Sequence, residues 1–235
     1  MPSETGKPST RLGQTGWAQA GILLAVWVVL VGVVIGVGRV ITGPLRRSMD
    51  PPENDLARWF VDSRSSLLTP LADFGTLLGD IKTVVALGLA MAVVVWLWRR
   101  EARPVVFVVT TMVGVTGLYL LAVTADPRPR PPVEILDPGL DPTHSFPSGH
   151  VGASMAVYGG LVVLVWTYAR RMRWLVTPLL LLVPPVVAVS RLYEGAHHLS
   201  DVLTSVAYGA VWLVATTVVL LAPDRTPPVE RPGAR

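Results

Sequence analysis

The chain has 235 residues, of which 51% are hydrophobic and 15% charged, and its formal net charge is +4. Soluble domains carry about 25% charged residues, so the deficit and the long uncharged runs argue against a soluble protein and indicate a membrane protein. The absence of cysteine excludes disulfides and cysteine-based metal sites or nucleophiles. The arginines border apolar runs, which favours a role in membrane topology over nucleic-acid binding.

Six apolar runs are long enough, with their flanking residues, to span a bilayer as helices of about 20 residues. The sequence lacks the alternating ten-residue segments of a transmembrane barrel. We therefore expect an all-α, integral membrane six-transmembrane-helix bundle over residues 17–222, between flexible cytoplasmic tails at 1–16 and 223–235. The runs are Trp17–Ile41, Thr83–Trp98, Val105–Ala125, Val151–Tyr168, Trp174–Val189 and Val202–Ala222.

The segment between the first two runs, residues 42–80, has a mixed composition. Apolar residues recur at helical spacing over residues 67–78, and the aromatic pair Trp59 and Phe60 lies among charged residues. This pattern predicts one or two amphipathic helices that lie at the membrane interface or against the bundle.

The arginines predict the orientation of the chain in the membrane. The two shortest connections, residues 99–103 and 169–173, each contain three arginines and lie on the same side by span count. The positive-inside rule makes that side cytoplasmic, together with both termini. Segments 42–80, 126–150 and 190–201 are then expected to face outward from the cell membrane.

The apolar runs hold almost no ionisable residue at mid-depth, where a charge costs about 2.5–3.5 kcal/mol on insertion scales. Polar residues gather instead in the outward segments 126–150 and 190–201. Ion pumps and many transporters need charges within the membrane, so this distribution favours chemistry at one membrane face. A flippase of lipid phosphates, which could use a groove, is the alternative.

The earlier of these two segments begins with a run of prolines that stiffens the backbone at a helix end. This run presents Arg128 and Arg130, either to lipid headgroups or to an anionic ligand. Ser148 is predicted to be the N-cap of a helix that begins near His150, and Gly149 permits the close approach of a ligand. A helix N-terminus is a ready anion site, and an ordinary cap is the alternative interpretation.

The later segment is SRLYEGAHHLSD, residues Ser190–Asp201. Arg191 ends a predicted helix and offers a rigid fork suited to phosphate oxygens. If the last helix begins near His197, this histidine and Asp201 share a helix face, because they are four residues apart. An aspartate bonded to one imidazole nitrogen fixes the tautomer and frees the other nitrogen as a nucleophile or base.

A competing interpretation is a metal site formed by His197, His198 and Asp201. It is disfavoured because adjacent histidines on a helix diverge by about 100° and no further acidic cluster is evident. His198 is more simply an interfacial or substrate-facing residue. Glu194 is expected to be a solvated loop charge, and His144 has no role that its spacing assigns.

Segments 126–150 and 190–201 together offer two histidines, three arginines, an aspartate and a helix N-terminus at one membrane face. Arginines and N–H groups suit a transferring phosphoryl group, whose catalysis is mainly positioning and charge stabilisation. One histidine would attack, and the other would protonate the leaving oxygen. Since arginine supplies the positive charge, we expect no metal and no other cofactor. The expected partners are a lipid phosphate or diphosphate and the surrounding membrane lipids.

These residues resemble the motifs of the type 2 phosphatidic acid phosphatase superfamily of integral membrane lipid phosphatases. The family's second motif, Pro-Ser-Gly-His, matches Pro147–His150. Its third motif, Ser-Arg, five residues, His, three residues, Asp, matches Ser190–Asp201 with every spacing intact. Its first motif, a lysine followed after six residues by Arg-Pro, is partial: Arg130 fits, but the lysine position falls on Val123.

The resemblance covers residues 55–222 and implies a lipid phosphatase that acts on phosphatidic acid, phosphatidylglycerol phosphate or a polyprenyl diphosphate. It implies that His197 is the nucleophile, which forms a phosphohistidine, that Asp201 orients it, and that His150 is the general acid. The implied phosphate-binding residues are Arg130, Ser148, Gly149 and Arg191.

The absent lysine has two possible consequences. Another cation could replace it, and the candidates are Arg128, Lys82 and Arg39, which all lie near the predicted outward face. Alternatively, the chain is a catalytically weak or silent member of the family that binds lipid phosphates.

Overall fold

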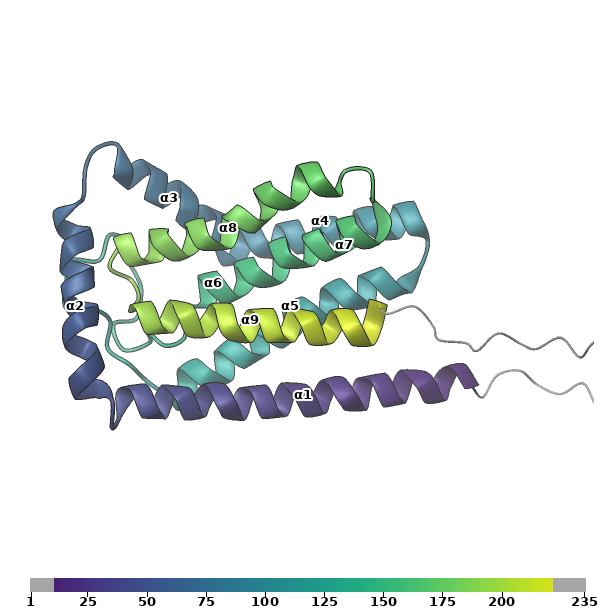
Figure 1. Ribbon diagram of the computed structural model, residues 1–235, viewed down its shortest axis with the longest axis horizontal. Helices are drawn as coiled ribbons and strands as arrows, with labels where there is room; N and C mark the ends of the chain where they lie inside the picture. The colour runs from purple at the N-terminus through teal and green to yellow at the C-terminus, as the bar shows by residue number, and fades with distance from the viewer. Residues whose placement is uncertain (1–10, 222–235) are drawn as a thin grey trace, which may run out of the picture.

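The structure is a computed structural model that describes residues 11–221, and side-chain surroundings from residue 16 onward (Figure 1). Within this part the chain is all-helical apart from its connections, and six helical segments are long and apolar enough to cross a membrane. The predicted six-span bundle is confirmed. The helices are α1 (Arg11–Thr42), α2 (Arg46–Asp62), α3 (Leu68–Gly79), α4 (Ile81–Arg99), α5 (Ala102–Ala125), α6 (Gly149–Ser154), the π-helical η1 (Met155–Gly159), α7 (Gly160–Tyr168), α8 (Arg173–Tyr193) and α9 (Leu199–Leu221).

The helix boundaries differ slightly from the apolar runs. The fourth span is continuous from α6 through η1 to α7, and it begins at Gly149 rather than Val151. Helix α1 begins at Arg11, so part of the segment predicted to be a tail is helical. Residues 1–10 and 222–235, which include the last residue of the sixth predicted run and the whole C-terminal tail, lie outside the described residues.

The two amphipathic helices predicted between the first and second spans are α2 and α3. Helix α2 lies across one end of the bundle (Figure 1), where it buries Glu53 and Ala57 and exposes Trp59. Helix α3 packs along α8 at the same end. A Cβ atom at Gly75 would lie 2.1 Å from Oγ of Ser190, so the contact between α3 and α8 depends on glycine there.

The polar segments gather at the end of the bundle that α2 covers. The connection from α5 to α6 and the short connection from α8 to α9 both lie there (Figure 1). The two arginine-containing connections, between α4 and α5 and between α7 and α8, lie at the opposite end with the start of α1 and the end of α9. The helices thereby bring three segments that are distant in sequence to one place.

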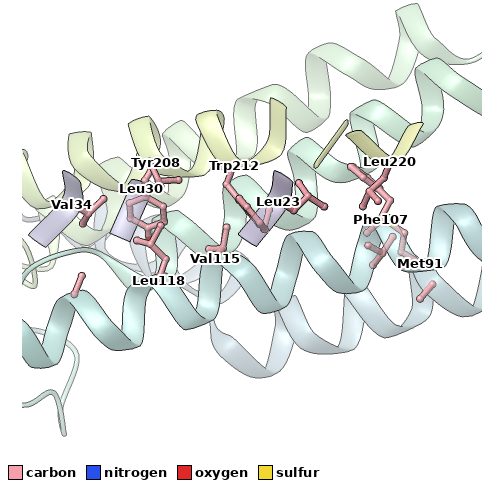
Figure 2. Close-up of a cluster of buried hydrophobic side chains, with 14 of the residues drawn as sticks. Leu23, Leu30, Val34, Met91, Phe107, Val115, Leu118, Tyr208, Trp212 and Leu220 are labelled. Carbon is pink, nitrogen blue, oxygen red and sulfur yellow. The ribbon is translucent and has the colours of Figure 1, made fainter. Parts of the chain in front are cut away.

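A cluster of buried apolar side chains joins α1, α4, α5 and α9 (Figure 2). Phe107 and Leu118 of α5 have no exposed surface, and Trp212 of α9 is 3% exposed. The indole of Trp212 lies directly on α5, because a Cβ atom at Gly114 would be 2.3 Å from it. Its Nε1 donates a hydrogen bond to the carbonyl oxygen of Thr111 at 3.1 Å, which satisfies the one polar atom of the ring. This packing fixes α9, and with it the position of Asp201.

Candidate active site

Three elements converge at the α2 end of the bundle: the N-terminus of α6, the last turn of α8 and the connection before α9. The chain turns sharply after α8 at Gly195, whose φ of +73° lies in the left-handed region that favours glycine. A Cβ atom there would also lie 2.8 Å from Cγ2 of Val133. The turn brings His197 back toward the last turn of α8, which contains Arg191.

His197 lies in the connection before α9 and is 5% exposed. Its Nδ1 lies 2.7 Å from the carbonyl oxygen of Ser145. A carbonyl oxygen only accepts hydrogen bonds, so Nδ1 carries the proton and Nε2 is the unprotonated nitrogen. The distance from Nδ1 to Oδ2 of Asp201 is 3.8 Å, which is beyond hydrogen-bond range. Nδ1 of His197 therefore donates to the carbonyl oxygen of Ser145, in place of the direct hydrogen bond that was expected to Asp201.

The reason for this difference is where α9 begins. The helix begins at Leu199 rather than near His197, so His197 and Asp201 do not share a helix face. The histidine is instead positioned by the connection between α5 and α6.

Burial lowers the pKa of His197 to about 4. The positive charges of Arg191 and Arg130 act in the same direction, while Asp201 opposes them. At neutral pH the imidazole is consequently neutral, which is the form that has a lone pair on Nε2 and acts as a nucleophile.

Asp201 is fully buried and bound on both carboxylate oxygens. Its Oδ2 accepts hydrogen bonds from Oγ of Ser145 at 2.5 Å and from the backbone N–H of His198 at 2.9 Å. Its Oδ1 accepts one from Nη1 of Arg128 at 2.5 Å. The carboxylate thus links the connection after α5 to the start of α9, and it faces His197 without a direct bond.

Arg128 does not lie where a phosphate ligand was predicted. Its Nη1 donates to Asp201 and to Oγ of Ser200 at 2.7 Å, and its Nη2 donates to Oε2 of Glu53 at 2.7 Å. Burial alone would lower the pKa of Arg128, but the carboxylates of Asp201 and Glu53 outweigh burial and raise it. Because both terminal nitrogens are engaged by the protein, we assign Arg128 no phosphate-binding role.

Arg191, in the last turn of α8, is held by two carboxylates through one of its terminal nitrogens. It is fully buried, and its Nη1 donates to Glu194 at 2.6 Å and to Asp137 at 2.9 Å. Its Nε and Nη2 have no hydrogen-bond partner among the described residues. Buried donors without partners are costly, so two such N–H groups on one planar fork indicate a site for an acceptor.

Glu194 is not the solvated loop charge that the sequence suggested. Its side chain is 3% exposed and pairs with Arg191. Burial raises the pKa of Glu194, and the positive charge of Arg191 opposes this effect. The carboxylate of Glu194 therefore fixes the orientation of the Arg191 guanidinium through Nη1.

Helix α6 begins at Gly149 with Ser148 at the cap position, as predicted. The side chain of Ser148 forms no capping hydrogen bond, and its buried Oγ has no partner within residues 16–221. His150 follows in the first turn, where Arg191 and His197 are its charged and titratable neighbours. The N-terminus of α6 therefore brings Ser148 and His150 near Arg191 and His197.

Arg130 holds the connection after α5 against the connection before α9. Its Nη1 donates to the carbonyl oxygen of Ala196 at 2.5 Å, its Nη2 to that of His144 at 3.0 Å, and its Nε to that of Asp141 at 2.8 Å. Burial and the nearby charge of Arg191 lower the pKa of Arg130. A guanidinium has five N–H groups, so two remain for an anion.

The other singled-out residues lie in different surroundings. Arg39 is 3.4 Å from Asp126, and Lys82 is exposed at the start of α4. Val123, at the expected lysine position, is buried in α5.

His144 binds Asp141 through Nδ1 at 2.8 Å, and Nε2 of His198 lies 3.2 Å from the carbonyl oxygen of Pro129. Among the residues that the structure describes, no group of three or more His, Asp or Glu side chains could hold a metal ion.

Two cavities border the site. An apolar groove of about 400 Å³ lies between the start of α4, α5 and α6. Its lining includes Tyr119, Gly149 and His150. A polar cavity of about 330 Å³ lies between α2 and the connection after α5, where it is bordered by Arg128, Arg130 and His198. One cavity therefore suits an apolar chain, and the other suits water.

Three contributors were not found from the sequence. Tyr119 packs against Gly149 and has Arg130 and Arg191 as charged neighbours. Its position, one helical turn before Val123, offered a signal, because it shares the helix face on which the lysine was expected. Ser145 and Glu53 gave no signal, since they reach the site through tertiary contacts alone.

The family model described as the PAP2 superfamily matches residues 84–224 of the chain. The chain belongs to the PAP2 superfamily. This membership confirms the resemblance that the two complete motifs indicated. No curated protein sequence matches the chain.

A solved structure supports the fold of this PAP2 protein. It is similar to the crystal structure of the transmembrane PAP2-type phosphatidylglycerolphosphate phosphatase from Bacillus subtilis, with a TM-score of 0.66 and 19% sequence identity. The match covers 83% of this chain and 92% of the other chain. At this identity the likeness concerns the arrangement of the helices alone.

Proposed function

We propose that this PAP2 protein is a membrane lipid phosphatase that hydrolyses a lipid phosphate or diphosphate through a phosphohistidine on His197. The observation that carries the proposal is that Nε and Nη2 of Arg191 and Oγ of Ser148 are buried without hydrogen-bond partners among the described residues. A phosphoryl group has three oxygens that accept hydrogen bonds, so one phosphoryl group bound between these residues would satisfy all three atoms.

In the first step, Nε2 of His197 attacks the phosphorus atom, and the bond from phosphorus to the lipid oxygen breaks. His150 donates a proton to that oxygen, so the lipid leaves as an alcohol, or as a monophosphate if the substrate is a diphosphate. Arg191, Ser148 and the remaining N–H groups of Arg130 bind the oxygens on which negative charge is concentrated.

In the second step, water attacks the phosphorus of the phosphohistidine. His150 now accepts a proton from the water, the phosphorus–nitrogen bond breaks, and inorganic phosphate leaves. Through both steps Nδ1 of His197 keeps its proton and donates it in a hydrogen bond to the carbonyl oxygen of Ser145, so the ring returns in the tautomer that reacts.

The apolar groove supports a lipid as the substrate. It has a volume of about 400 Å³ and reaches His150 from between α4 and α5. A hydrocarbon chain in this groove would stay within the membrane-spanning part of the bundle, while its phosphate reaches the N-terminus of α6. Tyr119 stands at the junction, against Gly149 and near Arg130 and Arg191, where the lipid oxygen nearest to phosphorus would lie.

The arginine-rich connections support an active site on the extracytoplasmic face. They lie at the end of the bundle opposite to the site, and the positive-inside rule assigns that end to the cytoplasm. The expected substrates are phosphatidic acid, phosphatidylglycerol phosphate and polyprenyl diphosphates. The name of the similar Bacillus subtilis protein favours testing phosphatidylglycerol phosphate first.

The test is phosphate release from this panel of lipids by the purified protein in detergent. We expect His197→Ala and His150→Ala to abolish turnover while the melting temperature stays near that of the wild type. His144→Ala is the matched control, since this histidine lies in the connection before α6 and is half-exposed, and we expect its activity to be unchanged. Undiminished turnover in His197→Ala would refute the proposal.

The same preparation separates the two alternative functions. A silent member of the family would bind the lipid phosphates tightly without releasing phosphate. A flippase would move a labelled lipid phosphate across a liposome bilayer in the His197→Ala variant as fast as in the wild type. We expect neither result, because the unpartnered fork of Arg191 lies near His197, whose Nε2 is the unprotonated nitrogen, at one end of the bundle.

A further inference from the structure

We infer that Glu53, on the helix that lies across the end of the bundle, is a positioning residue for the nucleophile His197. This inference rests on the proposed function and deepens it. Glu53 acts through Arg128 and Asp201. Neither Glu53 nor Arg128 touches the reacting atoms. The result is a catalytic site that is complete only when α2 is docked.

The first observation is the direction of the Glu53 side chain. Helix α2 lies across the bundle end (Figure 1), and most of its charged residues, such as Asp55 and Arg58, are exposed. Glu53 is 8% exposed and points into the protein instead. Removing a carboxylate from water is costly unless it is paired and hydrogen-bonded, so its burial requires specific partners.

The partners of Glu53 belong to the active-site elements. Its Oε1 accepts a hydrogen bond from the backbone N–H of Ser200 at 2.6 Å, in the first turn of α9. Its Oε2 accepts one from Nη2 of Arg128 at 2.7 Å. A carboxylate at a helix N-terminus satisfies a free N–H group and is favoured by the helix dipole. Glu53 therefore fixes the start of α9 one residue before Asp201.

Arg128 bridges two carboxylates with its two terminal nitrogens. Nη2 binds Glu53, while Nη1 binds Oδ1 of Asp201 at 2.5 Å. Because one positive charge is shared between two negative charges, the group of three keeps a net charge of −1. That negative charge lies beside His197, whose Nδ1 is 3.8 Å from the other oxygen of Asp201.

This net charge matters at the moment of reaction. The imidazole of His197 gains positive charge as Nε2 bonds to phosphorus, and a nearby negative charge stabilises that state. Without Glu53, Arg128 would be compensated by Asp201 alone, with a weaker contribution from Asp50 at 3.4 Å. The potential at His197 would then become more positive.

The groups that face His197 come from four elements, and all must be considered when its protonation is measured. They are Asp201 on α9, Arg191 on α8, Arg130 in the connection after α5, and His150 on α6. His198, the next residue in the chain, faces Glu53 directly, since its Nδ1 lies 3.8 Å from Oε2 of Glu53. The Glu53 variants leave all these groups in place, and His198 is titrated beside His197. A shift of His197 over a pH range in which His198 keeps one protonation state then reports the charge of Glu53 relayed by Arg128.

The test compares Glu53→Gln, which keeps the shape and removes the charge, with Glu53→Asp, which keeps the charge. For Glu53→Gln we expect kcat to fall about 10- to 100-fold, by analogy with the range found when a residue that orients a metal-ligating side chain is replaced. KM should change less than about twofold, and the acidic limb of kcat/KM should move to lower pH, because loss of a negative charge disfavours the imidazolium. Glu53→Asp should recover part of kcat.

Asp55→Asn, on the exposed side of α2, is the matched control and should behave as the wild type.

A second measurement does not depend on turnover. In protein labelled with ¹³C on its four histidines, the NMR titration of His197 should move to lower pH in Glu53→Gln and remain in place in Asp55→Asn. An unmoved titration, or an activity loss that merely follows a loss of folded protein, would overturn the inference. If the proposed function itself fails, His197→Ala will retain the wild-type turnover, while the titration still decides the role of Glu53.

Discussion

The carbonyl oxygen of Ser145 lies 2.7 Å from Nδ1 of His197, closer than any oxygen of Asp201. A main-chain group, held by the connection between α5 and α6, therefore determines which nitrogen of the histidine carries the proton. Asp201 has a different position, 3.8 Å from Nδ1, where it contributes charge rather than a hydrogen bond.

This arrangement predicts a limited effect of Asp201→Asn on activity. In a site where the aspartate alone fixes the tautomer, the same change lowers kcat by about 10⁴-fold. Here the Ser145 carbonyl keeps the tautomer, so we expect a loss between about 10-fold and 10³-fold in kcat, measured on the best substrate of the panel. A loss as large as that of His197→Ala would show that Asp201 fixes the tautomer after all.

The pKa of His197 predicts how activity depends on pH. Burial lowers that pKa to about 4, and only the neutral imidazole attacks, so kcat/KM should be sustained above pH 5 and fall as the pH drops through about 4. The second ionisation of a phosphate monoester lies near pH 6, so the substrate is titrated separately and its ionised fraction is divided out of the profile. An acidic limb at pH 6.5 that persists after this correction would contradict the burial of His197.

Replacement of Arg191 should affect stability as well as activity. Arg191→Met leaves the buried carboxylate of Glu194 without its partner, and breaking a buried pair in this way costs about 3–5 kcal/mol. We expect a lower melting temperature and no turnover. Adding Glu194→Gln should restore part of the melting temperature but none of the activity. Recovery of activity in the double variant would show that Arg191 does not bind the phosphate.

Tyr119→Phe tests the role of the tyrosine that lies between the apolar groove and the proposed phosphate site. The ring that packs against Gly149 is kept, and only the hydroxyl group near Arg130 and Arg191 is lost. Hydrogen bonds to charged groups contribute about 1.5–3 kcal/mol, so we expect kcat/KM to fall about tenfold or more at an unchanged melting temperature. The control is Tyr168→Phe, at the end of α7 on the opposite side of the bundle, which should leave kcat/KM unchanged. Equal activity in the two variants would remove Tyr119 from the site.

The sequence was sufficient to predict the fold and to predict that the candidate residues of segments 126–150 and 190–201 meet at one end of the bundle. Apolar runs of membrane-spanning length predicted the six helices, because a bilayer leaves few alternatives to a helix. The concentration of polar residues in two segments predicted one end of the bundle as the site. Ser148 and Arg191 were predicted from local rules, since cap positions and helix ends are set by neighbouring residues.

The contacts between distant segments could not be predicted in the same way. Arg128 was expected to bind phosphate because its residue type suits an anion, but its partners are Asp201 and Glu53. Glu53 is 75 residues away from Arg128 in the sequence, on a helix whose charged residues gave no reason to single it out. Glu194 was taken for a solvated charge for the same reason, because burial depends on the packing of α3 and α8 around it.

Mapping the covalent intermediate shows whether His197 carries the phosphoryl group. The protein is mixed with ³²P-labelled phosphatidic acid, phosphatidylglycerol phosphate or polyprenyl diphosphate, quenched in alkali and digested into peptides. The account predicts label on the peptide that contains His197, and no label in the His197→Ala variant. Turnover of the lipid without label on this peptide, at a rate that His197→Ala retains, would contradict the account.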